Sequence, residues 1–128
     1  MSGSGRSTSR LSAIKHAFSG WWYVLRTQRN AWLHAFASGI VVVLGIRLRL
    51  SMQDWATLVL AIGLVWTAEF VNTALEAVVD LASPETHPLA RVGKDVGAAA
   101  VLIAALVAAL IGLFILGPPL LDVLTNSK

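Results

Sequence analysis

Residues 69–80 carry the sequence EFVNTALEAVVD and lie at the inner end of a long apolar run that opens at Trp55. Apolar runs of this length normally exclude charge, yet this one holds two glutamates and ends on an aspartate. At about 100° per residue, its polar side chains fall within roughly 100° of arc on one helical face. They are Glu69, Asn72, Thr73, Glu76 and Asp80. A membrane helix that segregates carboxylates in this way shields them from lipid, so these residues are functional candidates.

The composition indicates an integral membrane protein with one domain. The chain has 128 residues, of which 56% are hydrophobic and 13% charged, and its mean hydropathy is +0.72. A soluble domain of this size could not bury so much apolar surface. The absence of cysteine excludes disulfides and thiolate metal sites. Basic residues flank the apolar segments, which suits a lipid bilayer with an anionic surface better than a nucleic acid.

Apolar periodicity predicts an all-α integral membrane fold, in which an N-terminal amphipathic surface helix precedes three transmembrane helices. Residues 1–10 are expected to be disordered, because they are rich in Ser, Gly and Arg. The surface helix is expected over residues 11–25, followed by a polar link over residues 26–30. We expect a single membrane domain over residues 11–117, with spans at about 31–50, 55–81 and 95–117.

The ends of the spans carry recognisable signals. Asp54 is expected to cap the second span, and Asp95 the third. Pro118 and Pro119 are expected to end the third span before a tail over residues 118–128.

The distribution of basic residues predicts the topology. Seven of the ten Lys and Arg residues precede the first or third span, and three fall on the other side. This bias favours a cytoplasmic N-terminus, with the acidic face and Lys94 on the same, cytoplasmic side. Small residues at 100, 104, 108 and 112 form a stripe along the third span, which predicts close helix packing. Since three spans are few to enclose a carboxylate cluster, we expect self-association.

The residue types favour phosphoryl transfer. Oxygen ligands such as Glu76 suit Mg²⁺, which normally arrives with phosphates. Lys94 could pair with a phosphate, and Glu69 could take a proton from an attacking hydroxyl. The residues alone leave three classes open, namely a kinase, a proton-coupled carrier and a structural oligomer. A lone histidine such as His34 is expected to be a hydrogen-bonded structural residue.

The pattern E-x-x-N-T-A-L-E-x-x-x-D over residues 69–80, with a downstream Lys94-Asp95, resembles the prokaryotic diacylglycerol kinase/undecaprenol kinase family. The resemblance covers roughly residues 12–116. It implies a homotrimer in the bacterial inner membrane that moves the γ-phosphate of ATP to a membrane lipid alcohol, using Mg²⁺. The alternative is a non-catalytic membrane oligomer that is related to these kinases.

The resemblance also implies a role for each matching residue. Glu69 corresponds to the general base and Asn72 to its polar partner. Metal binding corresponds to Glu76 and Gln28, and nucleotide binding to Lys94, Asp95, Glu85 and Glu76. The supporting positions of the motif are Thr73, Asp80, Asn30, His34 and His87.

One position departs from the family pattern. The string TQRN over residues 27–30 has Gln28 where relatives often carry glutamate. Gln28 offers a carbonyl oxygen to a metal but no negative charge, so weaker metal binding, altered nucleotide geometry and lost activity all stay open. The acceptor is expected to be undecaprenol, with diacylglycerol as the alternative. This preference rests on the resemblance of five positions to the undecaprenol kinase branch, which are Asn30, His34, Pro84, His87 and Pro88.

Overall fold

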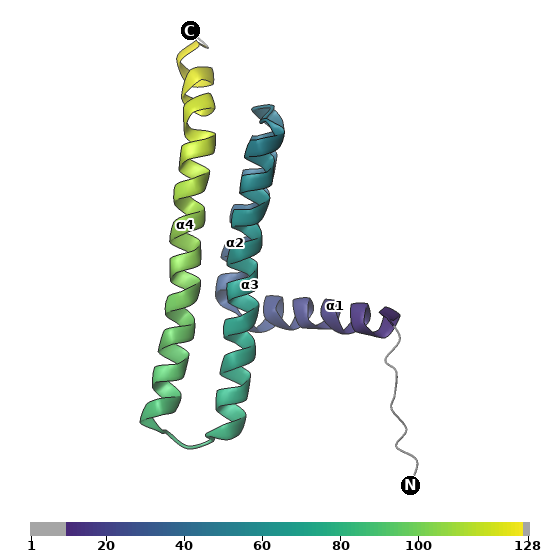
Figure 1. Cartoon of the computed structure of the whole chain (residues 1–128), viewed down its shortest axis with the longest axis vertical. Coiled ribbons are helices and arrows are strands. Elements are labelled where there is room, and N and C mark those ends of the chain that lie inside the picture. Colours follow the sequence, from purple (N-terminus) through teal and green to yellow (C-terminus); the bar gives the residue numbers. More distant parts are fainter. Residues whose placement is uncertain (1–9, 127–128) are drawn as a thin grey trace.

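The computed structural model describes residues 10–126, and this part of the chain forms four α-helices. They are α1 (Arg10–Thr27), α2 (Arg29–Arg47), α3 (Met52–Ala82) and α4 (Pro88–Asn126). Helices α2, α3 and α4 run roughly alongside one another, while α1 projects from them at a steep angle (Figure 1). Each of α2, α3 and α4 is long and apolar enough to cross a membrane. The prediction of an all-α fold with three spans is confirmed, whereas residues 1–9 lie outside the described part.

The junction between α1 and α2 is tighter than the sequence suggested. The prediction of a polar link over residues 26–30 was wrong, because only Gln28 separates the two helices. Gln28 has an extended backbone, with φ −102° and ψ 113°, and its N–H still bonds to the carbonyl of Val24 at 2.8 Å. One extended residue is therefore enough to turn the chain from α1 into α2.

A short turn joins α2 to α3 by standard capping. The N–H of Leu50 bonds to the carbonyl of Gly45 at 3.2 Å, while Arg49 adopts φ 52°, a conformation that ends many helices. The expectation that Asp54 caps the next helix was wrong. Ser51 is the N-cap, and its Oγ accepts the N–H of Asp54 at 3.1 Å. A serine followed three residues later by an acid forms a capping pair, so Asp54 lies inside the first turn.

Helix α4 extends beyond the predicted span at both ends. It begins at Pro88, and Nδ1 of His87 accepts the N–H of Leu89 at 3.2 Å. Asp95 therefore lies in the second turn, and the expectation that it caps the helix was wrong. Pro118 and Pro119 do not end the helix, which continues to Asn126. Gly117 has no Cβ to clash with the ring of Pro118, which relieves part of the restriction on the residue before proline. The structure gives no corresponding explanation for Pro119, which follows Pro118.

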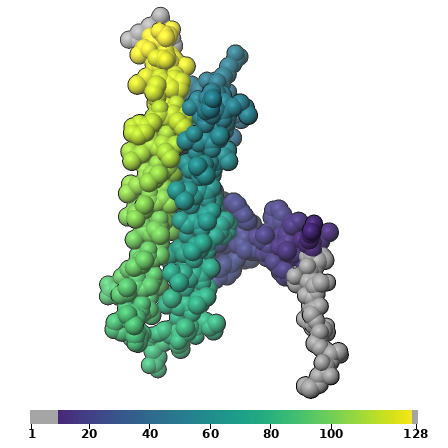
Figure 2. All heavy atoms as spheres, in the orientation of Figure 1, coloured from purple at the N-terminus to yellow at the C-terminus, as the bar shows by residue number. Residues whose placement is uncertain are grey.

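Helices α3 and α4 form the main packed pair, and Figure 2 shows their side chains in contact over much of their length. The contact relies on Gly97, where an added Cβ would overlap Oδ1 of Asn72 and lie 3.3 Å from Cδ2 of Leu75. Of the predicted small-residue stripe, Ala104 is buried within the protomer and Ala100 is exposed. Because Gly97 has no side chain, the backbone of α4 can lie against the side chain of Asn72 on α3.

The first helix is held against α3 by aromatic rings. The ring centroids of Trp21 and Trp66 lie 4.6 Å apart, and those of Trp21 and Phe70 lie 5.0 Å apart. Val24, Ala31 and Trp66 form a small buried core where α1, α2 and α3 meet. Helix α1 thus contacts α3 at residues 66–70, and the lower end of α3 extends past it (Figure 1).

Candidate active site

The polar face of α3 is buried where it passes this junction. Glu69, Asn72 and Thr73 are only 2%, 8% and 5% exposed. The hydroxyl of Thr73 donates to the backbone carbonyl of Glu69 at 2.9 Å. This hydrogen bond lies within the helix and does not involve the carboxylate of Glu69. Nε2 of His34 on α2 lies 3.5 Å from Oε2 of Glu69. The structure therefore brings a histidine to the most deeply buried carboxylate.

Two turns beyond Glu69 on α3, Glu76 is held between two side-chain amides. Nδ2 of Asn72 donates to Oε1 at 3.0 Å, and Nε2 of Gln28 donates to Oε2 at 3.1 Å. The extended backbone of Gln28 places this side chain at the corner between α1 and α2. Gln28 and Glu76 are thus direct neighbours, although 48 residues separate them in the sequence.

The groups around Glu76 are compatible with a magnesium ion that arrives with phosphates. Within residues 10–126, no three His, Cys, Asp or Glu side chains gather as a metal-binding cluster. However, Oδ1 of Asn72 is buried without a hydrogen-bond partner, and the amide of Gln28 carries an oxygen beside the same carboxylate. One carboxylate with neutral oxygens, completed by substrate phosphates, is a common way to bind Mg²⁺.

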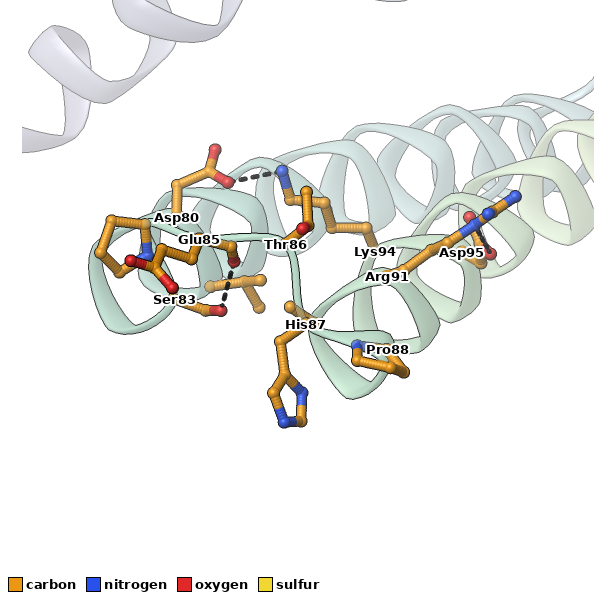
Figure 3. A pocket seen from close by; sticks show the side chains of 12 residues that line it. Asp80, Ser83, Glu85, Thr86, His87, Pro88, Arg91, Lys94 and Asp95 are labelled. Atoms are coloured by element: carbon orange, nitrogen blue, oxygen red, sulfur yellow. Dashed lines mark hydrogen bonds and ion pairs between the residues drawn. The ribbon is translucent and has the colours of Figure 1, made fainter.

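A second group of polar residues lines an open cavity of about 720 Å³ at the α3–α4 loop (Figure 3). Nζ of Lys94 lies 2.5 Å from Oδ1 of Asp80, and Nε of Arg91 lies 3.8 Å from Oδ2 of Asp95. Both ion pairs are largely exposed, so each contributes little to stability and can open to admit an anion. Sequence reasoning missed Arg91 as a site residue, although its position four residues before Asp95 on a helix was a usable signal.

The remaining predicted residues lie in or near these two groups. Glu85 lines the outer cavity, where its backbone carbonyl accepts the hydroxyl of Ser83 at 2.9 Å. His87 lines the same cavity and caps α4 as described above. Asn30 is exposed in the first turn of α2, and no side-chain hydrogen bond or ion pair in the described residues joins it to Glu69, Glu76 or Lys94. The site residues thus divide into an inner group around Glu69 and Glu76 and an outer group around Lys94.

The two groups are suited to different chemical tasks. The inner group offers a buried carboxylate that could accept a proton. The outer group offers a lysine and an arginine in an open cavity, where they could bind phosphates. Since Glu76 and Asp80 are one turn apart on α3, the two groups adjoin along the helix.

Comparisons with known proteins show the family to which the chain belongs. Residues 15–116 match the family described as prokaryotic diacylglycerol kinase. An undecaprenol kinase from Bacillus subtilis (strain 168) is 41% identical over 105 residues, which cover 82% of this chain and 85% of the relative.

Two further relatives are named diacylglycerol kinase. That of Synechocystis sp. (strain ATCC 27184 / PCC 6803 / Kazusa) is 40% identical over 115 residues, covering 89% of this chain and 66% of the relative. That of Escherichia coli (strain K12) is 40% identical over 93 residues, covering 67% of this chain and 76% of the relative. Because the family match spans most of the chain, this protein is a multi-pass membrane lipid kinase that belongs to the prokaryotic diacylglycerol kinase family.

Proposed function

We propose that this lipid kinase transfers the γ-phosphate of ATP to undecaprenol, with Mg²⁺ as the metal. The observation that carries the proposal is the continuity of the inner and outer groups along α3, from buried Glu69 to the Lys94–Asp80 pair. The choice of undecaprenol rests on the Bacillus relative and on the resemblance to the undecaprenol branch described above. Diacylglycerol is the competing acceptor, because other relatives of similar identity carry that name.

The position of α1 supports a specific placement in the membrane. If α1 lies on the inner surface, residues 66–70 of α3 stand at the boundary of the hydrocarbon. At 1.5 Å per residue, Met52 lies about 21 Å from Trp66 and about 27 Å from Phe70, close to the ~30 Å of a bilayer core. Asp80 then lies about 16 Å beyond Glu69, in the aqueous phase. A lipid hydroxyl and a nucleotide would approach the site from opposite sides of this boundary.

In the proposed reaction, the acceptor's hydroxyl oxygen forms a bond to the γ-phosphorus while the bond from that phosphorus to the β–γ bridging oxygen breaks. The bridging oxygen keeps the electron pair and leaves with ADP. Glu69 accepts the hydroxyl proton and later returns it to water. Lys94 and Arg91 exchange their carboxylate partners for phosphate oxygens, which neutralises charge on the nucleotide.

Glu76 and Gln28 are the residues that would hold Mg²⁺. When bound, the ion would neutralise charge on the phosphate oxygens. Glu76 would supply the carboxylate and Gln28 would turn its amide oxygen toward the ion, while Nδ2 of Asn72 would keep its hydrogen bond to Glu76 and hold that carboxylate in place. Gln28 contributes no charge, so we expect this enzyme to need more Mg²⁺ than a relative with glutamate at this position.

We further propose a homotrimer in the bacterial inner membrane with a cytoplasmic N-terminus. Exposed apolar side chains cover α4 on the side away from α3, among them Leu106, Leu110 and Leu113. Lipid or neighbouring copies would cover these side chains in the membrane. The basic residues before α2 and at the start of α4 favour the proposed orientation.

The acceptor assignment can be tested with purified full-length protein and labelled ATP. Undecaprenol and diacylglycerol are supplied at equal concentration in mixed micelles with Mg²⁺, separately and in competition. We expect the label mainly in undecaprenyl phosphate. Label mainly in phosphatidic acid would overturn the acceptor, and label in neither lipid would overturn the proposed function.

A further inference from the structure

The carboxylate of Glu69 has a histidine as its polar neighbour. Nε2 of His34 and Oε2 of Glu69 lie 3.5 Å apart, and their side chains are 13% and 3% exposed. Nε2 is itself buried and has no hydrogen-bond partner. The distance is at the outer limit of a hydrogen bond, and a small movement of either side chain would close it. Two buried polar groups in apolar surroundings are strongly favoured to pair, since each is costly to leave unsatisfied.

The imidazole of His34 is held in place by neighbours on α2 and α3. Its ring meets that of Trp66 edge-on, with centroids 6.4 Å apart at 70°. Nε1 of Trp66 donates to Oγ of Ser38 at 3.3 Å, and Ser38 donates to the backbone carbonyl of His34 at 2.7 Å. Trp66 also stacks on Trp21 of α1. The ring therefore sits in a framework built from three helices.

The groups that face His34 are few and mostly apolar. The cavity of about 410 Å³ beside it is lined by Ser38 and by apolar residues of α2, α3 and α4. Among the residues that line this cavity, His34 carries the only ionisable side chain. The carboxylate of Glu69 is thus the acceptor within reach of Nε2 in the described part of the chain.

We propose that His34 is a positioning residue for Glu69. The neutral imidazole carries its proton on Nε2, and this N–H donates a hydrogen bond to Oε2 of Glu69. The bond fixes the carboxylate and leaves Oε1 to take the hydroxyl proton. His34 keeps its own proton throughout, so no bond is made or broken at the ring. This inference goes further than the proposed function and rests on it for the role of Glu69. It replaces a purely structural role for His34 with a role in orienting the general base.

Two substitutions separate orientation from packing. His34→Leu keeps an apolar side chain of moderate size but removes the donor, whereas His34→Gln places an amide N–H at similar reach. Val41→Ala serves as the packing control, because it enlarges the same cavity and leaves His34, Ser38 and Trp66 intact. All three are measured as full-length protein in micelles, with turnover, KM for Mg-ATP and thermal unfolding recorded on each.

The expected result is a loss of kcat that the amide restores. His34→Leu should lower kcat at least about tenfold while KM for Mg-ATP stays within about twofold, because the polar contact of His34 is with Glu69 and not with Lys94 or Glu76. His34→Gln should return kcat to within about threefold of the native enzyme, and Val41→Ala should keep kcat within the same range. Native kcat in His34→Leu, or equal losses in the Leu and Gln variants with native unfolding, would overturn the proposal.

A spectroscopic readout keeps the test independent of the kinase reaction. Protein labelled with ¹⁵N-histidine reports the tautomer of His34 by NMR, and the resonance is assigned by its loss in His34→Gln. We expect a proton on Nε2, none on Nδ1, and a shift of the Nε2 signal in Glu69→Gln. The Nδ1–H tautomer, or an Nε2 signal unchanged by Glu69→Gln, would contradict the contact even if lipid phosphorylation is observed. If no lipid is phosphorylated, the NMR result still decides whether the contact exists.

Discussion

The substitution Gly97→Ala tests whether the close approach of α4 to α3 sets the geometry of Glu76. An added Cβ would overlap Oδ1 of Asn72 and lie 3.3 Å from Cδ2 of Leu75. Because Oδ1 is the far end of a flexible side chain, the amide can turn away while the helices stay packed. That turn breaks the 3.0 Å hydrogen bond from Nδ2 of Asn72 to Glu76. The damage should therefore fall on the site and only slightly on the fold.

The size of the effect follows from the bond that is lost. A hydrogen bond to a charged group contributes about 1.5–3 kcal/mol, and about 1.4 kcal/mol corresponds to a tenfold change in affinity. We expect KM for Mg-ATP to rise by about tenfold or more. Replacing glycine by alanine inside a helix stabilises it by up to about 1 kcal/mol, which offsets the crowding against Leu75. Thermal unfolding should therefore change little.

The assay is a Mg-ATP titration of lipid phosphorylation with the purified full-length enzyme, paired with thermal unfolding of the same sample. Gly63→Ala is the matched control, because it lies on α3 and an added Cβ there meets nothing within 4 Å of the protomer. The control should gain the same helix preference and keep the native KM. A native KM in Gly97→Ala would refute the reasoning, and so would a collapse of its stability.

Three other substitutions test the neighbourhood of the site and the fold. Glu76→Gln should weaken the binding of Mg-ATP, and raised Mg²⁺ should restore part of its activity in a magnesium titration; an unchanged requirement would remove Glu76 from metal binding. Gln28→Glu, which adds a carboxylate 3.1 Å or so from Glu76 where the amide now lies, should lower the Mg²⁺ needed for half activity; a higher requirement would show that the two carboxylates repel without sharing an ion. Gly45→Ala should lower thermal stability by about 1–3 kcal/mol, because its Cβ would lie 2.8 Å from the ring of Trp55; native unfolding would mean that the turn adjusts freely.

The helices were predictable because their signals are local. Apolar length predicted the three spans, and the period of the carboxylates placed Glu69, Asn72 and Thr73 on the face of α3 that is in fact buried. The ends were less predictable, since competing signals occur within a few residues. Ser51 and Asp54 both suit a cap, and the hydrogen bond selects Ser51. Pro118 suggested a helix end, but the helix continues to Asn126.

The contacts within the site were harder to predict, because they join distant parts of the chain. Nothing in the sequence around Gln28 shows that its amide meets Glu76, since one extended residue between α1 and α2 decides it. The role of Gly97 was also hidden, because a glycine in an apolar helix has many explanations until its neighbour is known. His34 was expected to be structural, and only its distance to Glu69 suggests a further role.

The most direct test of the division between the inner and outer groups is one pair of measurements on Glu69→Gln. The substitution keeps the size of the side chain and removes its capacity to accept a proton. We expect turnover to fall by on the order of 10²-fold or more, while equilibrium binding of Mg-ATP to the same sample stays native. A variant that loses Mg-ATP binding, or one that keeps native turnover, would contradict the assignment of Glu69 as the proton acceptor separate from the nucleotide site.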